Sequence, residues 1–152
     1  MIPKIDRIYM IEALKEAQKA FDADEVPVGA VIVHKGKIIA RARNQIKLLK
    51  DPTAHAEMIA ITQAASYLEN ERLLATTLYV TIEPCMMCAG ALVLARVERV
   101  CFGASDPRTG AFGSVIDINK KKLNHNIAVC KGVLEEECSL LIKEFFKNKR
   151  KK

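Results

Sequence analysis

The hydrophobic positions near the start of the chain repeat with the period of a helix. Apolar residues follow one another there at steps of three or four. They are Ile5, Ile8, Ile11, Leu14, Ala17 and Phe21. Residues with this spacing lie along one side of an α-helix, so the pattern predicts an amphipathic helix that buries this stripe.

A β-hairpin is predicted next. The segment from Val26 to Val33 is rich in valine, and the segment from Lys37 to Ala42 returns to apolar residues after Lys35 and Gly36. Two such runs joined by a short turn with glycine are typical of two antiparallel strands. The more polar stretch from Asn44 to Pro52 predicts a loop.

The middle of the chain alternates between helical and strand patterns. Alanine and long apolar residues predict a helix from His55 to Leu68, and the β-branched segment from Thr77 to Ile82 predicts a buried strand. Pro84 ends this strand and suits the first turn of the next helix, which the apolar run from Met86 to Ala95 continues.

The last third of the chain contains two more strand candidates and a final helix. We expect strands at Val97 to Phe102 and Ile127 to Lys131, separated by a loop that begins with Gly103 to Gly113. Glu135 to Phe146 has the pattern of an amphipathic helix. The order αββαβαββα predicts a mixed sheet with helices on both faces, which is a three-layer α/β/α fold.

Length and composition favour a single soluble domain over residues 1–152. Half of the 152 residues are hydrophobic, which is enough for a core of ordinary size. No segment approaches the roughly 18 uncharged apolar residues of a membrane helix, and no leader pattern opens the chain, so we expect a cytoplasmic protein. The five cysteines are an odd number, which favours a metal or catalytic site over a disulfide framework.

The net charge of +6 is concentrated at the C-terminus. Five of the last six residues, Lys147 to Lys152, are lysine or arginine. Such a basic tail can be a solvated helix end, or it can contact a phosphate backbone. The charge by itself does not decide between these two interpretations.

Three residues have the types and positions of a metal site. Cys85 and Cys88 are one helical turn apart, and His55 stands at the start of the neighbouring predicted helix. If both helix ends meet at one edge of the sheet, the three side chains can bind one ion. Three ligands leave a fourth position open for water, which is typical of catalytic zinc, although iron could use the same ligands.

Glu57 is the candidate for moving protons near this metal. It follows His55 by two residues, and only Glu83 is another carboxylate as close to the ligands in sequence. Two helical steps separate side chains by about 200°, so His55 and Glu57 reach one pocket only if the first turn of the helix is frayed. The alternative is that Glu57 serves only the helix dipole.

These motifs, H-x-E followed by P-C-x-x-C, resemble the signature of the zinc-dependent nucleoside and nucleobase deaminases of the cytidine deaminase superfamily. The similarity to bacterial tRNA adenosine deaminases extends over nearly the whole chain. The similar segments are 25–30, 51–57, 78–91, 102–104, 109–111 and 124–125, together with Asn44. The resemblance implies a cytidine-deaminase-like fold with a mixed five-stranded sheet.

The resemblance also implies a reaction. One Zn²⁺ per subunit, held by His55, Cys85 and Cys88, would activate water to attack C6 of an adenine flipped out of the tRNA anticodon stem-loop. Glu57 would take the proton of the water and pass it to the ring and the departing ammonia. The wobble adenosine would become inosine.

Five substrate contacts and a homodimer follow from the same resemblance. Asn44 would hydrogen-bond the base, the Ala56 N–H would hold it in place, and Val28 would flank it. Asp106 would contact the nucleotide near the target, and Asn124 would close the pocket. A second subunit would contribute to the RNA surface.

Two alternatives stay open at this point. A deaminase of a free nucleobase or nucleoside, such as guanine or cytosine, would use the same ligands but would need no basic tail. A zinc-stabilised RNA-binding module without catalysis would need a fourth protein ligand, for which Cys101 is the candidate.

Overall fold

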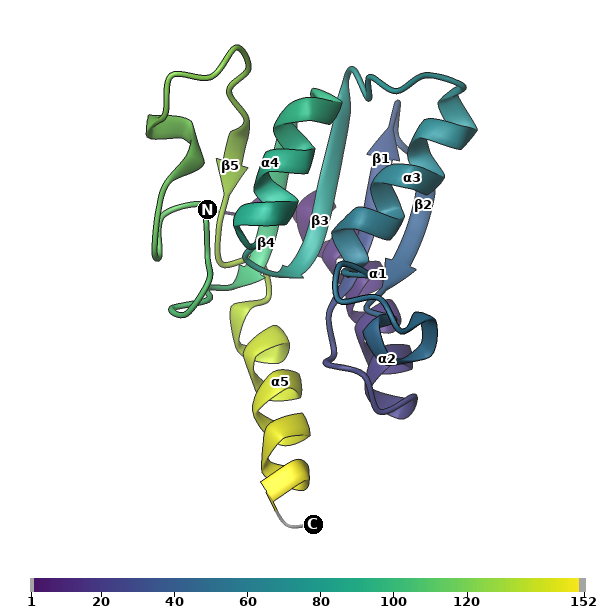
Figure 1. The fold of residues 1–152 in the computed structure, drawn as a ribbon, viewed down its shortest axis with the longest axis vertical. Helices are drawn as coiled ribbons and strands as arrows, with labels where there is room; N and C mark the ends of the chain where they lie inside the picture. Colours follow the sequence, from purple (N-terminus) through teal and green to yellow (C-terminus); the bar gives the residue numbers. More distant parts are fainter. Residues whose placement is uncertain (1, 151–152) are drawn as a thin grey trace.

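The computed structural model describes residues 2–150, which form a sheet flanked by helices (Figure 1). The elements in chain order are α1 (Lys4–Asp22), β1 (Gly29–His34), β2 (Lys37–Arg43), α2 (Ile46–Leu49), α3 (Ala56–Leu68), β3 (Thr76–Ile82), α4 (Met86–Ala95), β4 (Arg99–Ala104), the 3₁₀ helix η1 (Ile118–Lys120), β5 (Ala128–Cys130) and α5 (Glu135–Arg150). Every predicted helix and strand is present, with ends shifted by a few residues.

The five strands form one mixed sheet in the order β2-β1-β3-β4-β5. β1 is antiparallel to β2 and β3, whereas β3, β4 and β5 run parallel. The hairpin turn has Lys35 and Gly36 at φ 51° and 74°, the conformation that matches the twist of two-residue hairpins. The ends of β2, β3 and β4 and the start of β1 therefore share one edge of the sheet, the lower edge in Figure 1.

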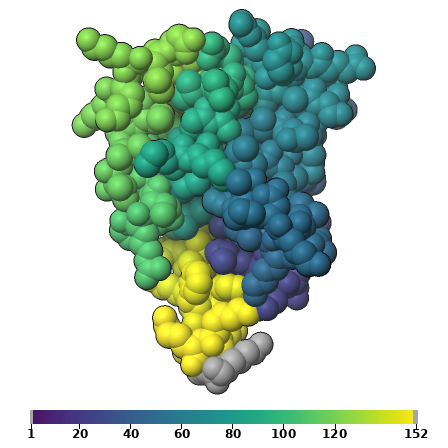
Figure 2. All heavy atoms as spheres, viewed as in Figure 1, coloured from purple at the N-terminus to yellow at the C-terminus, as the bar shows by residue number. Residues whose placement is uncertain are grey.

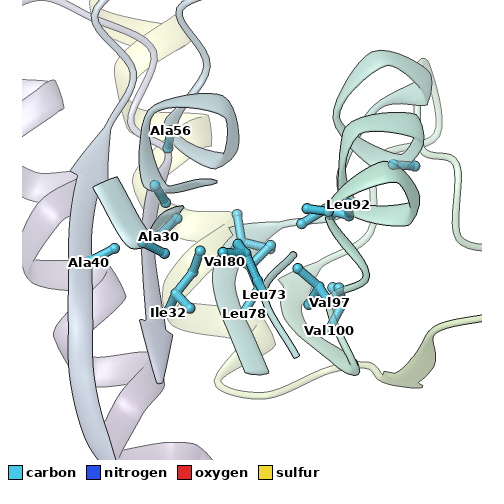
Figure 3. Packing of buried hydrophobic residues seen from close by; sticks show 14 of the residues in the cluster. Ala30, Ile32, Ala40, Ala56, Leu73, Leu78, Val80, Leu92, Val97 and Val100 are labelled. Carbon is cyan, nitrogen blue, oxygen red and sulfur yellow. The ribbon is translucent and has the colours of Figure 1, made fainter. Parts of the chain in front are cut away.

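Helices cover both faces of the sheet, which confirms the three-layer architecture. α3 and α4 pack on one face, where Ala56, Leu78, Val80 and Leu92 belong to the larger core (Figure 3). α1 and α5 pack on the other face. The first turns of α3 and α4 pack on the larger core. This packing fixes where both helices begin relative to the edge of the sheet.

The prediction of which residues α1 buries is partly wrong. Three of the six predicted residues are about half exposed: Ile5, Ile8 and Ile11. Ala17 is buried as predicted, but Met10 and Ala13, which lie outside the predicted stripe, are buried beside it. The reason is a very close helix–strand contact, because a Cβ on Gly29 would lie 2.0 Å from the Ala13 carbonyl oxygen. At this point of closest approach the helix carries the small residues Ala13 and Ala17.

Several boundaries differ from the prediction. The loop expected from Asn44 to Pro52 contains the short helix α2, and η1 lies between β4 and β5. α5 continues to Arg150, so the basic residues from Lys147 form its last turn, while Lys151 and Lys152 lie outside the described residues. Within residues 2–150, no helix is both long and apolar enough to span a bilayer.

Candidate functional site

The predicted metal ligands meet at the sheet edge where β3 ends. His55 is the N-cap of α3 and Cys85 is the N-cap of α4, so both helices begin at the site. Cys88 lies in the first turn of α4. Pro84 precedes the N-cap and not the first turn as expected, because the helix begins two residues later, at Met86. The positive ends of two helix dipoles therefore point toward the sulfur atoms, which favours thiolates there.

The distances within this group fit a zinc ion. His55 Nδ1 lies 3.7 Å from Cys85 Sγ and 3.5 Å from Cys88 Sγ. Tetrahedral coordination, with zinc–nitrogen and zinc–sulfur bonds of about 2.1 and 2.3 Å, would separate nitrogen and sulfur by about 3.6 Å. The imidazole and the two thiols are also the donor types that Zn²⁺ prefers. The residues present therefore match the ion that the sequence implied.

The ionisation of the three ligands shows how strongly they interact. Contact with the Cys88 thiol and with His55 lowers the pKa of Cys85 to about 4. The same contact with Cys85, together with burial, raises the pKa of Cys88, and the nearby Cys85 sulfur raises the pKa of His55. One thiol is thus already a thiolate without a metal, and a cation among the three would favour deprotonation of the others.

The group contains three candidate ligands within the described part of the chain. Cys101, considered above as a fourth ligand, lies in another group with Asp6 and Cys130. Cys101 packs in the core between the sheet and α1, on the other face from α3 and α4. It does not complete a closed four-ligand site, so a position for a non-protein ligand stays open.

Glu57 reaches the ligands without a frayed helix. His55 has an extended backbone (φ −73°, ψ 151°) and stands outside α3, so the helical angle of about 200° does not separate the two side chains. Glu57 is 3% exposed, and its carboxyl group lies near enough to the Cys88 thiol for each group to influence the pKa of the other. Burial raises the pKa of Glu57 to about 7. A carboxyl group with a pKa near neutrality can both accept and donate a proton.

Asn44, Ala56 and Val28 lie together beside Glu57. The Asn44 backbone N–H donates to the Val28 carbonyl oxygen (3.1 Å). The Ala56 N–H, which was expected to hold the base, donates to Asn44 Oδ1 at 2.8 Å. All three residues are buried. Since the Asn44 oxygen is occupied, its Nδ2 amide is the group that can donate to a bound base.

The two remaining predicted contacts lie in different places. Asp106 follows β4 at the same sheet edge, and its carboxylate accepts hydrogen bonds from Arg108 and Thr109 of its own turn. Asn124 is exposed, and its Oδ1 accepts from Arg96 at the C-terminal end of α4. That end is opposite to the cysteines, so the chain does not bring Asn124 to the other predicted site residues.

A cleft of about 710 Å³ lies between the ends of β3 and β4 and helix α5, and the candidate metal ligands are not among the residues that line it. Figure 2 shows α5 in yellow between the green segment after β4 and the blue segment around α2. Asp106 lies in the wall of the cleft. Four basic residues also line it: Arg108, Lys143, Lys149 and Arg150. The positive charge of these side chains makes the cleft suited to an anionic ligand.

Two buried carboxylates shape the loops of the site, and the sequence analysis did not identify their roles. Glu25 accepts the N–H groups of Lys47 and Leu48, which begin α2 in the segment between Asn44 and His55. Glu83 accepts hydrogen bonds from the segment after β4. Both lie within segments 25–30 and 78–91, but their partners are far away in sequence, so the pattern alone does not reveal them.

Comparisons with known proteins show the family of this chain. The family model of the MafB19-like deaminases matches residues 5–150. The tRNA-specific adenosine deaminase of Bacillus subtilis (strain 168) is 51% identical, over 97% of this chain and 92% of its own length.

Solved structures show the same fold. One comes from work on A-to-I editing by tRNA:A34 deaminases at the wobble position of transfer RNA. It superposes with a TM-score of 0.86 and 43% identity over 88% of this chain and 98% of its own. The guanine deaminase of Nitrosomonas europaea has a TM-score of 0.78 and 25% identity, over 91% of this chain and 83% of its own. The protein is thus a member of the MafB19-like deaminase family, and it is similar over nearly its whole length to tRNA-specific adenosine deaminases.

Proposed function

We propose that this protein converts the wobble adenosine of a tRNA anticodon stem-loop to inosine, with one Zn²⁺ per subunit held by His55, Cys85 and Cys88. The observation that carries the proposal is the three-ligand group with the carboxyl group of Glu57 near it. The names of the relatives that match almost the whole chain support the choice of adenosine in tRNA. Deamination at this position is hydrolytic and needs only water as co-substrate.

The reaction adds water to C6 of adenine and breaks the bond between C6 and the amino group. Zinc, when bound, supplies a Lewis acid that lowers the pKa of a water molecule toward about 7. Glu57 takes a proton from the attacking water and carries it to N1 of the ring. A second proton transfer through Glu57 converts the amino group to departing ammonia, which leaves inosine.

The buried position of Glu57 suits this role. Its side chain is 3% exposed, so the carboxyl group is shielded from bulk water. Its pKa of about 7, raised by burial, means that both protonation states are populated near neutral pH. Catalysis of this kind typically contributes a factor of about 10² to 10⁴ in rate.

The RNA would be held in two parts. Asn44 Nδ2 donates to the flipped base and Val28 packs against it, while the Ala56 N–H keeps Asn44 in place. The neighbouring nucleotides follow the cleft, where Asp106 stands at the wall. Lys143 and Arg150 on α5 would face the phosphates. Lys149 also lines the cleft, but its ammonium group is paired with Asp24.

We also propose that the protein is a cytoplasmic homodimer built from single-domain subunits of residues 1–152. α4 supports the dimer, since Met86 is 60% and Leu94 is 80% exposed on a helix that carries no charged residue. Exposed apolar residues of this size on a rigid helix are typical of protein–protein interfaces. Light scattering coupled to size exclusion tests this, and a mass of one chain would contradict it.

The function is tested with a synthetic anticodon stem-loop that carries adenosine at the wobble position. Zinc-loaded protein should release ammonia from this RNA, the Glu57→Ala variant should not, and free adenine, guanine and cytosine should stay intact. Release from a free base together with an inert RNA would overturn the substrate while leaving the zinc chemistry in place.

The second candidate is a deaminase of a free purine. The structural similarity to the guanine deaminase of Nitrosomonas europaea favours it. Salt dependence separates the two, because phosphate contacts make the affinity for RNA fall steeply with ionic strength, whereas binding of a neutral base is almost insensitive to salt.

A further inference from the structure

Glu83 uses its whole carboxylate to hold the segment after β4. Oε1 accepts hydrogen bonds from the Asp106 N–H (3.1 Å) and the Ser114 hydroxyl, and Oε2 accepts from the N–H groups of Phe112 (2.9 Å) and Ser114 (3.2 Å). The side chain is 2% exposed. A carboxylate has about four acceptor positions, so Glu83 has none left for a substrate or a water molecule.

The same segment, residues 105–114, is also attached to the turn that carries Cys85. The Ala111 N–H donates to the Pro84 carbonyl oxygen (2.9 Å), and Gly110 forms a β-bridge with Cys85. A Cβ on Gly110 would lie within 2.5 Å of all three atoms of the Glu83 carboxylate group. We call residues 105–114 the substrate loop. Only glycine fits at position 110 beside the Glu83 carboxylate, so the substrate loop and Glu83 are closely packed.

We propose that Glu83 is a positioning residue for RNA, which holds the substrate loop in the conformation that binds the nucleotide next to the target adenosine. This rests on the proposed function, in which Asp106 is that contact. The hydrogen bond from the Asp106 N–H to Glu83 fixes the start of the loop, and the bonds from Phe112 and Ser114 fix its end. A loop that is ordered before RNA arrives loses less conformational entropy on binding, so the affinity is higher.

The variant Glu83→Gln tests this with little change in shape. Its side chain keeps one oxygen and replaces the other with an NH₂ group, which cannot accept. If the oxygen stays with Phe112 and Ser114, the NH₂ group faces the Asp106 N–H, and only the Ser114 hydroxyl can turn to accept from it. The variant therefore releases the start of the loop at Asp106.

We expect KM for the anticodon stem-loop to rise about 10- to 100-fold in Glu83→Gln, the usual effect of losing a hydrogen bond to a charged group. The value of kcat should stay near that of the wild type, because the zinc ligands and Glu57 are untouched. In zinc-loaded protein without RNA, the amides of Asp106 and Phe112 should exchange with solvent faster than in the wild type. The zinc content should stay at one per chain.

Two further variants keep the test decisive. Glu71→Gln makes the same chemical change on an exposed surface residue and should leave KM, kcat and exchange unchanged. Ser114→Ala removes only the hydroxyl contact to Glu83 on an exposed residue, so it should fold even if Glu83→Gln does not, and it should raise KM in the same direction by a smaller factor.

The outcomes are distinct. A raised KM with a preserved kcat and faster exchange in the substrate loop supports the proposal. A fall in kcat at unchanged KM, or unchanged KM and exchange in both variants, overturns it. A wild-type protein that deaminates no RNA overturns the proposed function itself, and the role of Glu83 in RNA binding with it.

Discussion

Replacing Asn44 with aspartate separates two roles of one side chain. In the structure Asn44 is 6% exposed, and its Oδ1 accepts the Ala56 N–H at the start of α3. Aspartate keeps an oxygen in this place, and the N-terminus of a helix favours a negative charge. The substitution removes the Nδ2 donor, which is the group we assign to the base. The fold should therefore survive while base binding fails.

The magnitude follows from the hydrogen bond that is lost. An acceptor of the base left unpaired in a buried site costs about 1 to 3 kcal/mol, which corresponds to about 5- to 150-fold. The new carboxylate also repels this acceptor, so the loss should lie at the upper end. We expect kcat/KM for the stem-loop to fall about 100-fold, and the free energy of unfolding to change by about 1 kcal/mol or less.

The assay combines ammonia release with thermal unfolding. Asn70→Asp is the matched control, because Asn70 is exposed and its Oδ1 also accepts a backbone N–H, from Arg72 at 2.9 Å. The control should retain wild-type kcat/KM. If Asn44→Asp retains it as well, the Nδ2 amide does not contact the base. If Asn44→Asp unfolds while the control does not, the separation of roles is refuted.

Three further predictions concern stability, metal and salt. Asp6→Ala removes the buried partner of Arg99 (2.7 Å) and should lower the free energy of unfolding by about 3 kcal/mol. Arg99 lowers the pKa of Asp6 below 3.8, so the ion pair contributes fully to stability above about pH 4, and this contribution is lost as the pH falls further. The difference in the free energy of unfolding between the wild type and Asp6→Ala should therefore shrink in acid, and a difference that grows in acid would contradict the prediction. Cys88→Ser should lose bound zinc on dialysis while Cys130→Ser keeps one per chain; equal zinc contents would refute the ligand assignment. RNA affinity should fall linearly with salt on logarithmic axes, and a flat dependence would exclude phosphate contacts in the cleft.

The residues of the candidate metal site could be predicted from sequence because the evidence for them is local. Cys85 and Cys88 are separated by one helical turn, and a proline marks the start of their helix. Strand Thr76–Ile82 places that helix end beside His55, as the alternation of elements indicated. Local spacing and element order are the properties that a sequence shows most clearly.

The parts that failed depend on contacts between distant residues. The exposed Ile5 and Ile8 show that hydrophobicity alone does not choose the buried side of α1, since the close approach of the helix to Gly29 places Ala13 and Ala17 against the sheet. Helix α2 begins where Glu25, more than twenty residues earlier, accepts its N–H groups. The helical angle between His55 and Glu57 does not apply, because His55 is the N-cap and stands outside α3. Periodicity does not resolve a helix boundary to one residue.

The most direct test is the appearance of inosine at one position of an RNA. A stem-loop with adenosine at the wobble position and a second adenosine elsewhere in the loop is incubated with zinc-loaded wild type or Glu57→Gln, and each position is then read by sequencing. We predict inosine at the wobble position alone, with the wild type only. Inosine formed equally by Glu57→Gln, or no inosine at the wobble position with active zinc-loaded protein, would contradict the assignment of this site.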